Sequence, residues 1–228
     1  MIADKKTFFL GAGLMAVFVV VMVLAFSPLI NGLNALEYSD ALYNSISKGS
    51  AYYIPEARSE TAKHTGVTIR VGLSLDDAAQ ATRAARLLTA SGAEAELRGA
   101  ELDVAGELSA ILDSCLADAE AMYRNKGDEI SGRYGGDARL ALYDWWTALK
   151  SMDAALKKQK KFKEAKTVTL VKKKAVETAY NFYGIEPQKI TDRLGVVIFS
   201  LLFYVLYTVW YGFAILFMFE GWGLRLGH

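Results

Sequence analysis

Two long runs without a charged side chain stand near the ends of the chain. The first extends from Thr7 to Leu36, and its most apolar part reads FFLGAGLMAVFVVVMVLAFSPL. The second extends from Leu194 to Phe219 and reads LGVVIFSLLFYVLYTVWYGFAILFMF. A helix of about 20 apolar residues crosses the hydrocarbon core of a bilayer. The pattern therefore predicts two transmembrane helices, over residues 7–29 and 194–219.

The first run also has two features of a secretory signal peptide. Lys5 and Lys6 give it a basic start, and the small residues of Ala25–Ser27 have the spacing of a cleavage site. Its apolar stretch is longer than the usual core of such a peptide, which is about 7–15 residues. Pro28 and Asn31 also explain why a helix would end here. We therefore favour an uncleaved anchor.

The distribution of basic residues around the spans predicts their orientation. Two lysines precede the first span, and the first basic residue after it is Lys48. Because cytoplasmic flanks are rich in Lys and Arg, we expect both termini in the cytoplasm, with Arg225 marking the second, and residues 30–193 outside it. The expected location is the cell inner membrane. Lys189 and Arg193, just before the second span, favour the inverted arrangement.

The region between the spans begins with a linking segment over 30–66 and then changes its periodicity. Alternating β-branched and apolar positions are typical of strands, and apolar positions at i, i+3, i+4 and i+7 are typical of a helix face. Strands and helices are expected in turn at 67–71, 75–90, 94–98, 101–105 and 108–123. This β-α-β-β-α order predicts a small α+β domain over 67–125.

A long helical arm is expected over 137–183. Asp137 is a suitable N-cap, and apolar positions continue at helical spacing from Leu142 to Phe182. The β-prone run Thr167–Val171 is the one place where the pattern predicts a break. The expected fold class is thus an α+β membrane protein, in which two transmembrane helices flank a mostly helical extramembrane region.

The composition excludes several kinds of functional site. Of the 228 residues, 53% are hydrophobic and 22% charged, and the formal net charge of +1 gives no reason to expect nucleic acid as a partner. One cysteine, Cys115, excludes a disulfide framework and is expected to be a buried thiol. Two histidines, His64 and His228, are too few for a three-imidazole site and are expected in solvent. We therefore expect no cofactor, no metal site, no catalytic residue and no enzymatic activity.

Lysines are concentrated in the arm. Residues 30–149 carry a net charge of −7, whereas residues 150–193 carry +7. The basic cluster consists of Lys157, Lys158, Lys160, Lys161, Lys172, Lys173 and Lys174. Such a cluster attracts the anionic head groups of a lipid bilayer. An acidic partner, the acidic part of the same chain, or simple solvation of a helix face would account for it as well.

The second span is unusually rich in aromatic residues. Tyrosine in the middle of a span is not accounted for by an interfacial belt, and a buried hydroxyl needs a partner. Small residues four positions apart allow helices to approach closely. The residues expected to pack against a partner are Tyr204, Tyr207, Thr208, Trp210, Tyr211, Gly212, Ala12 and Ala16.

These features together predict a non-catalytic accessory or scaffolding subunit of an inner-membrane protein complex. It would dock on an integral membrane protein through its tyrosine-rich second span and present an extracytoplasmic domain. The alternative is an extracytoplasmic module, anchored at both ends and self-associating as a homo-oligomer, that binds a ligand or a soluble protein. An apolar pocket in the domain over 67–125 would favour the alternative.

Overall fold

The structure is a computed structural model that describes residues 2–224. The chain is mostly helical, with one three-stranded sheet. It divides into two compact units. The first unit is formed by the two ends of the chain, and the second is Ser50–Glu186. The linking segment expected over 30–66 is therefore shared between the two units.

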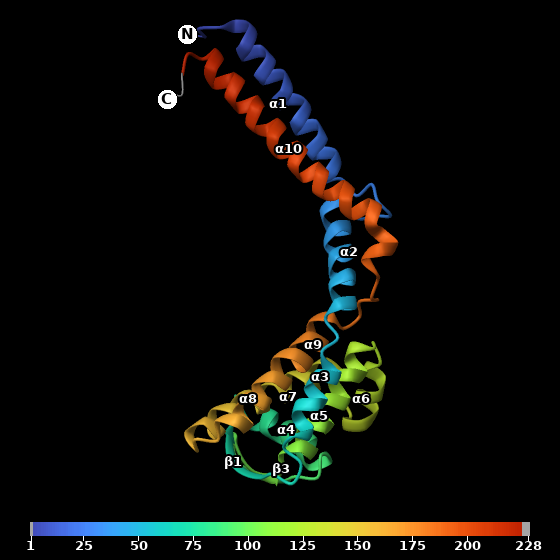
Figure 1. Cartoon of the computed structure of the whole chain (residues 1–228), viewed down its shortest axis with the longest axis vertical. Helices are drawn as coiled ribbons and strands as arrows, with labels where there is room; N and C mark the ends of the chain where they lie inside the picture. The colour runs from blue at the N-terminus through green and yellow to red at the C-terminus, as the bar shows by residue number, and fades with distance from the viewer. Residues whose placement is uncertain (1, 225–228) are drawn as a thin grey trace. The chain divides into compact units, whose positions relative to one another are not determined.

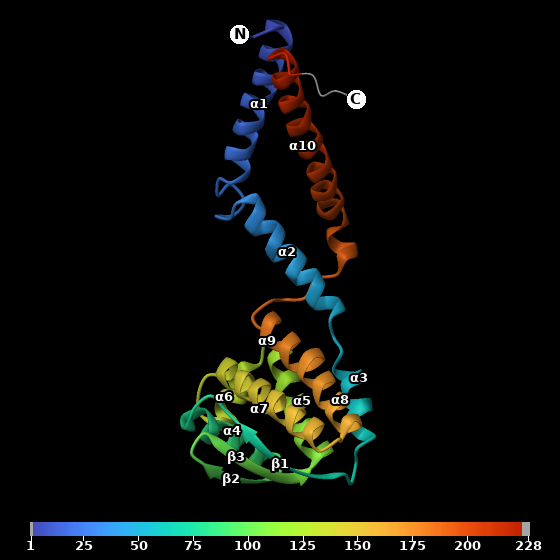
Figure 2. The same ribbon diagram turned by 90° about the vertical axis from the view of Figure 1, so that its left-hand side faces the viewer.

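The first unit is built on two apolar helices. Its elements are α1 (Lys5–Ala25), α2 (Ala35–Ser50), a 3-10 turn η2 (Ile190–Arg193) and α10 (Leu194–Gly221). The helix α1 begins where the Asp4 carboxylate accepts hydrogen bonds from the amides of Lys6 and Thr7. Figures 1 and 2 show α1 and α10 side by side. Both helices are long and apolar enough to cross a membrane, and they match the predicted spans to within a few residues.

The second unit contains the sheet and the remaining helices. Its elements are α3 (Ile54–Ala62), β1 (Thr68–Ser74), α4 (Ala78–Ala90), β2 (Glu94–Arg98), β3 (Glu101–Glu107), α5 (Leu108–Tyr123), α6 (Gly127–Tyr134), α7 (Ala138–Lys158), α8 (Phe162–Val171), a π-helical turn η1 (Lys172–Glu177) and α9 (Thr178–Phe182). The predicted strand–helix order over 67–125 is present. Asp77 caps α4 by accepting from the amide of Gln80.

The sheet is antiparallel, with strand order β1-β3-β2. In its register Val71 faces Val104 and Leu97 faces Leu102. Alternate residues of β1, such as Ile69 and Val71, are buried because one face of the strand lies against the helices. Helices gather on that one face of the sheet (Figure 2), so a single core lies between the two layers.

The basic arm expected over 137–183 is not one helix. The chain reverses direction after Lys158, and α8 returns along α7. The reason is that the apolar positions of the arm, including Val168 and Ala179, are fully buried in the same core as α5 and α7. The small domain and the arm thus form one unit, whose centre includes the fully buried Trp145.

Candidate functional site

The two apolar helices meet at glycines. Gly11 of α1 lies against α10: a Cβ at this position would be 2.7 Å from the amide nitrogen of Met218 and 2.8 Å from the carbonyl oxygen of Ala214. Gly221 of α10 lies in the same way against the backbone of Phe8. Because small residues permit close approach of helix backbones, these two glycines set the spacing of the pair.

Aromatic rings fill the interface between the same helices. The Phe18 ring of α1 lies 6.5 Å from Tyr207, 6.2 Å from Trp210 and 5.3 Å from Tyr211, measured between ring centres. The indole nitrogen of Trp210 donates to the carbonyl oxygen of Leu14 at 3.1 Å. These three predicted packing residues therefore contact α1, and Tyr207 also lies against the rings of Phe203 and Tyr204 within α10.

Other predicted packing residues point elsewhere. Tyr204 is 59% exposed, and Thr208 and Gly212 are also exposed. Spaced four residues apart, these three residues form one stripe of the helix, which we call the open face of α10. A Cβ added at Gly212 would meet no atom within 4 Å. On α1, Ala16 is exposed and Ala12 half-buried.

The tyrosine hydroxyls of α10 lack partners. In the part of the chain that the structure describes, no hydrogen bond is made by the hydroxyls of Tyr204, Tyr207 or Tyr211. The Thr208 hydroxyl, by contrast, donates to the carbonyl oxygen of Tyr204 at 2.7 Å. Between Leu194 and Phe219, the polar side-chain atoms that have no hydrogen bond among the described residues are thus the tyrosine hydroxyls.

The predicted basic cluster separates into two groups. Lys157, Lys158, Lys160 and Lys161 lie where α7 turns into α8, whereas Lys172–Lys174 lie in the π-helical turn η1. In the second group, Lys172 lies 5.4 Å from the Trp146 ring centre and Lys174 lies 4.0 Å from that of Tyr53. Lys172 and Lys174 therefore stack on aromatic rings, whereas Lys173 is exposed without a ring contact, as are Lys157, Lys158 and Lys160 of the first group.

An aromatic groove of about 290 Å³ lies between α7 and the η1–α9 segment. It is lined by Leu142, Tyr143, Trp146, Val176, Glu177, Tyr180 and Asn181. The rings of Tyr143 and Trp146 are stacked at 6.1 Å, and the Trp146 indole donates to Glu177 at 2.8 Å. The groove lies outside residues 67–125, the region in which an apolar pocket would favour the ligand-binding alternative. The spacing of Tyr143 and Trp146, three residues apart on α7, is the sequence signal that could have indicated it.

Two buried carboxylates, those of Asp118 and Asp144, join helices of the second unit. Asp118 of α5 is fully buried and accepts from the Trp145 indole at 2.8 Å, from the Tyr134 hydroxyl at 2.8 Å and from Arg133. Burial, with the hydrogen bond to this carboxylate, raises the pKa of Tyr134 to about 12. Asp144 likewise accepts two bonds from Arg83. The helical position of Asp118, three residues after Cys115, was a signal for its burial.

The residues with reactive side chains have structural roles. Cys115 is fully buried, and burial raises the pKa of its thiol well above the usual range. His64 was expected in solvent, but it is half-buried and its Nε2 lies 2.9 Å from the Thr167 hydroxyl. Arg225 and His228 lie outside the described residues. Within residues 2–224, no three His, Cys, Asp or Glu side chains are placed to hold a metal ion.

The geometry thus offers surfaces for binding: the open face of α10, the aromatic groove and the basic turn between α7 and α8. No protein family model, no curated protein and no solved structure matches the chain. A role for these surfaces therefore has to come from their own chemistry.

Proposed function

We propose that the protein is a non-catalytic accessory subunit of an inner-membrane complex. In this proposal α1 and α10 cross the bilayer as a pair, and the open face of α10 docks on a helix of another integral membrane protein. Both termini lie in the cytoplasm and residues 30–193 lie outside it, in keeping with the basic residues Lys5 and Lys6 before the first span.

The observation that carries the proposal is the Tyr204 hydroxyl. Tyr204 lies ten residues into α10, about 15 Å along the helix axis, which is half the thickness of a hydrocarbon core of about 30 Å. Its side chain is 59% exposed, and its hydroxyl has no partner within residues 2–224. A hydroxyl left without a hydrogen bond in apolar surroundings costs about 1–3 kcal/mol. A neighbouring helix can supply the missing acceptor.

The surroundings of Tyr204 suit such a helix. Gly212 lies two turns further along the same stripe, with open space above it. A small residue at this place lets a partner backbone come close enough to reach the tyrosine hydroxyl. The interface with α1 uses other residues, chiefly Gly11 and Gly221. Docking on the open face therefore leaves the α1–α10 pair intact.

The test is purification of the tagged full chain from native membranes at its endogenous level, in mild detergent, with mass spectrometry of what co-purifies. We expect one multi-span membrane protein in stoichiometric amount. Gly212→Leu should abolish this association because its side chain fills the space for the partner helix. Gly13→Leu is the matched control, since Gly13 also faces open space but belongs to α1. Tyr204→Phe should weaken the association about fivefold, for a loss of about 1 kcal/mol.

Two results would overturn the proposal. One is recovery of the chain as a monomer or a homo-oligomer without another membrane protein, which would favour the second candidate, an extracytoplasmic ligand-binding module. The other is an association that Gly212→Leu leaves unchanged, which would show that the open face of α10 is not the docking surface.

The aromatic groove is the observation in favour of that second candidate. Apolar pockets with a few polar groups are typical of ligand sites, and Glu177 and Asn181 line this groove together with Tyr180. A π-helical turn such as η1 is frequent at functional sites. A ligand that raises the unfolding temperature of the wild type but not of Tyr180→Ala would support it.

A further inference from the structure

The turn between α7 and α8 is held in one conformation. The amide of Lys161 donates to the carbonyl oxygen of Leu156 at 2.9 Å, and the amide of Lys160 donates to that of Lys157 at 3.0 Å. These two bonds are those of a Schellman motif. The side chains around this turn are therefore presented by a fixed backbone. We call Lys157, Lys158, Lys160, Lys161, Phe162 and Lys163 the lysine tip.

Most of the charge on the lysine tip is not neutralised within the protein. Lys157 pairs with Asp153 at 2.8 Å. Among the described residues, Lys158, Lys160, Lys161 and Lys163 form no ion pair. Four like charges within six positions repel one another, which destabilises the folded chain unless an anionic surface is nearby. These unpaired charges favour contact with an external anion.

Lys160 also occupies a strained backbone position. Its φ is +61°, in the left-handed region that glycine adopts without penalty. A glycine here would form the same turn at lower conformational cost. Backbone strain of this kind is a reason to look for a functional role, and the positive charge is what a glycine would lack.

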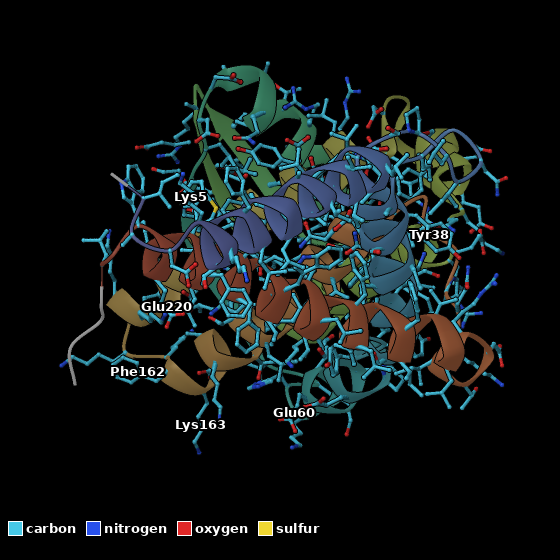
Figure 3. The ribbon with its side chains drawn as sticks, turned by 90° about the horizontal axis from the view of Figure 1, so that it is seen from above. Lys5, Tyr38, Glu60, Phe162, Lys163 and Glu220 are labelled. Carbon is cyan, nitrogen blue, oxygen red and sulfur yellow. The ribbon has the colours of Figure 1, made fainter. Side chains whose placement is uncertain are left out.

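Phe162 adds an apolar group to the centre of the same tip. Its side chain is 63% exposed, and Figure 3 shows Phe162 and Lys163 at the periphery of the ribbon. A single exposed phenylalanine is ordinary. An exposed phenylalanine among unpaired lysines is the combination found in segments that lie in a membrane interface, where the ring enters the head-group boundary and the lysines meet phosphates.

We propose that the lysine tip binds the surface of an anionic phospholipid membrane. Lysines act as flexible point charges, whereas the bidentate recognition of individual phosphate or carboxylate groups favours arginine, and the tip contains none. The apolar ring gains free energy in the lipid boundary. The proposal does not depend on docking through α10, so failure of one leaves the other standing.

The experiment uses the full chain in nanodiscs with a polarity-sensitive dye on a cysteine introduced at Gln159. The single native cysteine, Cys115, is fully buried and stays unlabelled. One sample has discs containing phosphatidylglycerol. A second has phosphatidylcholine discs to which phosphatidylglycerol vesicles are added. We expect a blue shift of the dye emission in at least one of these samples, and none with phosphatidylcholine alone.

Variants identify the side chains responsible. The combined variant Lys158→Gln, Lys161→Gln and Lys163→Gln should lose the shift. Where vesicles are titrated, its apparent affinity should fall about a hundredfold, since three lysine contacts supply about 3 kcal/mol and each 1.4 kcal/mol is tenfold. Phe162→Ser should lower the affinity about tenfold. The matched control replaces three lysines of η1, Lys172–Lys174, with glutamine and should keep the shift.

Two outcomes would overturn the proposal. Emission that phosphatidylglycerol leaves unchanged in both samples would show that the tip does not meet lipid in either arrangement. A shift produced by soluble poly-aspartate but not by phosphatidylglycerol membranes would assign the tip to an acidic protein partner instead. Circular dichroism of each variant confirms that a lost shift is not a lost fold.

Discussion

Asp118 joins three helices of the second unit through one buried carboxylate, and its replacement by alanine tests whether that carboxylate organises the core. The side chain leaves α5 and accepts hydrogen bonds from α6, through Arg133 and Tyr134, and from α7, through Trp145. Alanine removes the acceptor for all three donors at once. The three donors then differ in how easily water can replace the carboxylate.

The size of the effect follows from the exposure of each donor. The side chain of Arg133 is 44% exposed and can be solvated after the change. Tyr134 is half-buried, so water reaches its hydroxyl in part. Trp145 is fully buried, and its indole N–H would be left without a partner at a cost of about 1–3 kcal/mol. With the lost charged hydrogen bonds and the space left behind, we expect Asp118→Ala to lower the free energy of unfolding by about 3–5 kcal/mol.

The assay is urea unfolding of the full chain in mild detergent, followed by far-ultraviolet circular dichroism. Asp118→Asn keeps an acceptor oxygen for Trp145 but loses the charge, so its effect should be about half as large. Asp113→Ala on the same helix is the matched control: Asp113 is exposed, and its replacement should change stability by less than about 0.5 kcal/mol. If Asp118→Ala costs no more than Asp113→Ala, the carboxylate does not organise this core.

Three further predictions concern other parts of the chain. Lys160→Gly should raise the free energy of unfolding by about 1 kcal/mol in the same assay, because it relieves a positive φ; a loss of stability would contradict this. Burial acts to raise the pKa of Glu120, but hydrogen bonds from a tyrosine and two arginines outweigh it and lower that pKa below 4.5. Its carboxylate therefore stabilises the fold above that pH and less so as the pH falls, so Glu120→Gln should unfold with a shallower acid dependence. Gly11→Val should clash with the α10 backbone and lower the aggregation temperature in detergent, whereas Gly13→Val, which faces open space, should not.

The sequence predicted those strands and helices whose apolar residues repeat at a regular period. The strand at Glu94–Arg98 occurs at the predicted residues, and α5 follows the apolar spacing from Leu108. In α5 the residues that repeat at the helix period are those that meet the core, whereas in β2 only Ala95 packs against it and Leu97 is 47% exposed. The two apolar helices were equally evident, because a helix on the surface of a water-soluble protein carries charged residues on its outer face and seldom lacks them over such a length.

The reversal after α7 was not predictable in this way. Its turn has no glycine or proline, since Lys160 occupies the left-handed position, and apolar residues continue at helical spacing on both sides of it. The break predicted at Thr167–Val171 does not occur, since these residues lie within α8. Up to Lys166 the pattern is that of one long helix. What decides against it is the burial of Val168 and Ala179 in the core shared with α5, which is a tertiary effect.

The sequence also did not predict which face of α1 packs against which face of α10. The small residues predicted for packing included Ala16 and Gly212, yet the glycines that lie against the neighbouring apolar helix are Gly11 and Gly221. All four residues are small enough to let a helix approach. In a helix that is apolar on every side, the spacing of apolar residues does not indicate which side packs against a neighbour. Only the three-dimensional pairing distinguishes the glycines that lie in the contact between α1 and α10 from those that face open space.

That distinction makes the two proposed surfaces separable by experiment. Gly212→Leu alters only the open face of α10, and the glutamine variants of the lysine tip alter only the turn in the second unit. Changes at sites without shared contacts are expected to be additive in free energy. If both surfaces act independently, the combined variant should show the loss of partner and the loss of lipid binding, each at its single-variant size. A combined loss smaller than the sum would mean that partner docking and lipid contact stabilise the same arrangement of the protein, because each single variant then already removes the free energy by which one raises the affinity of the other.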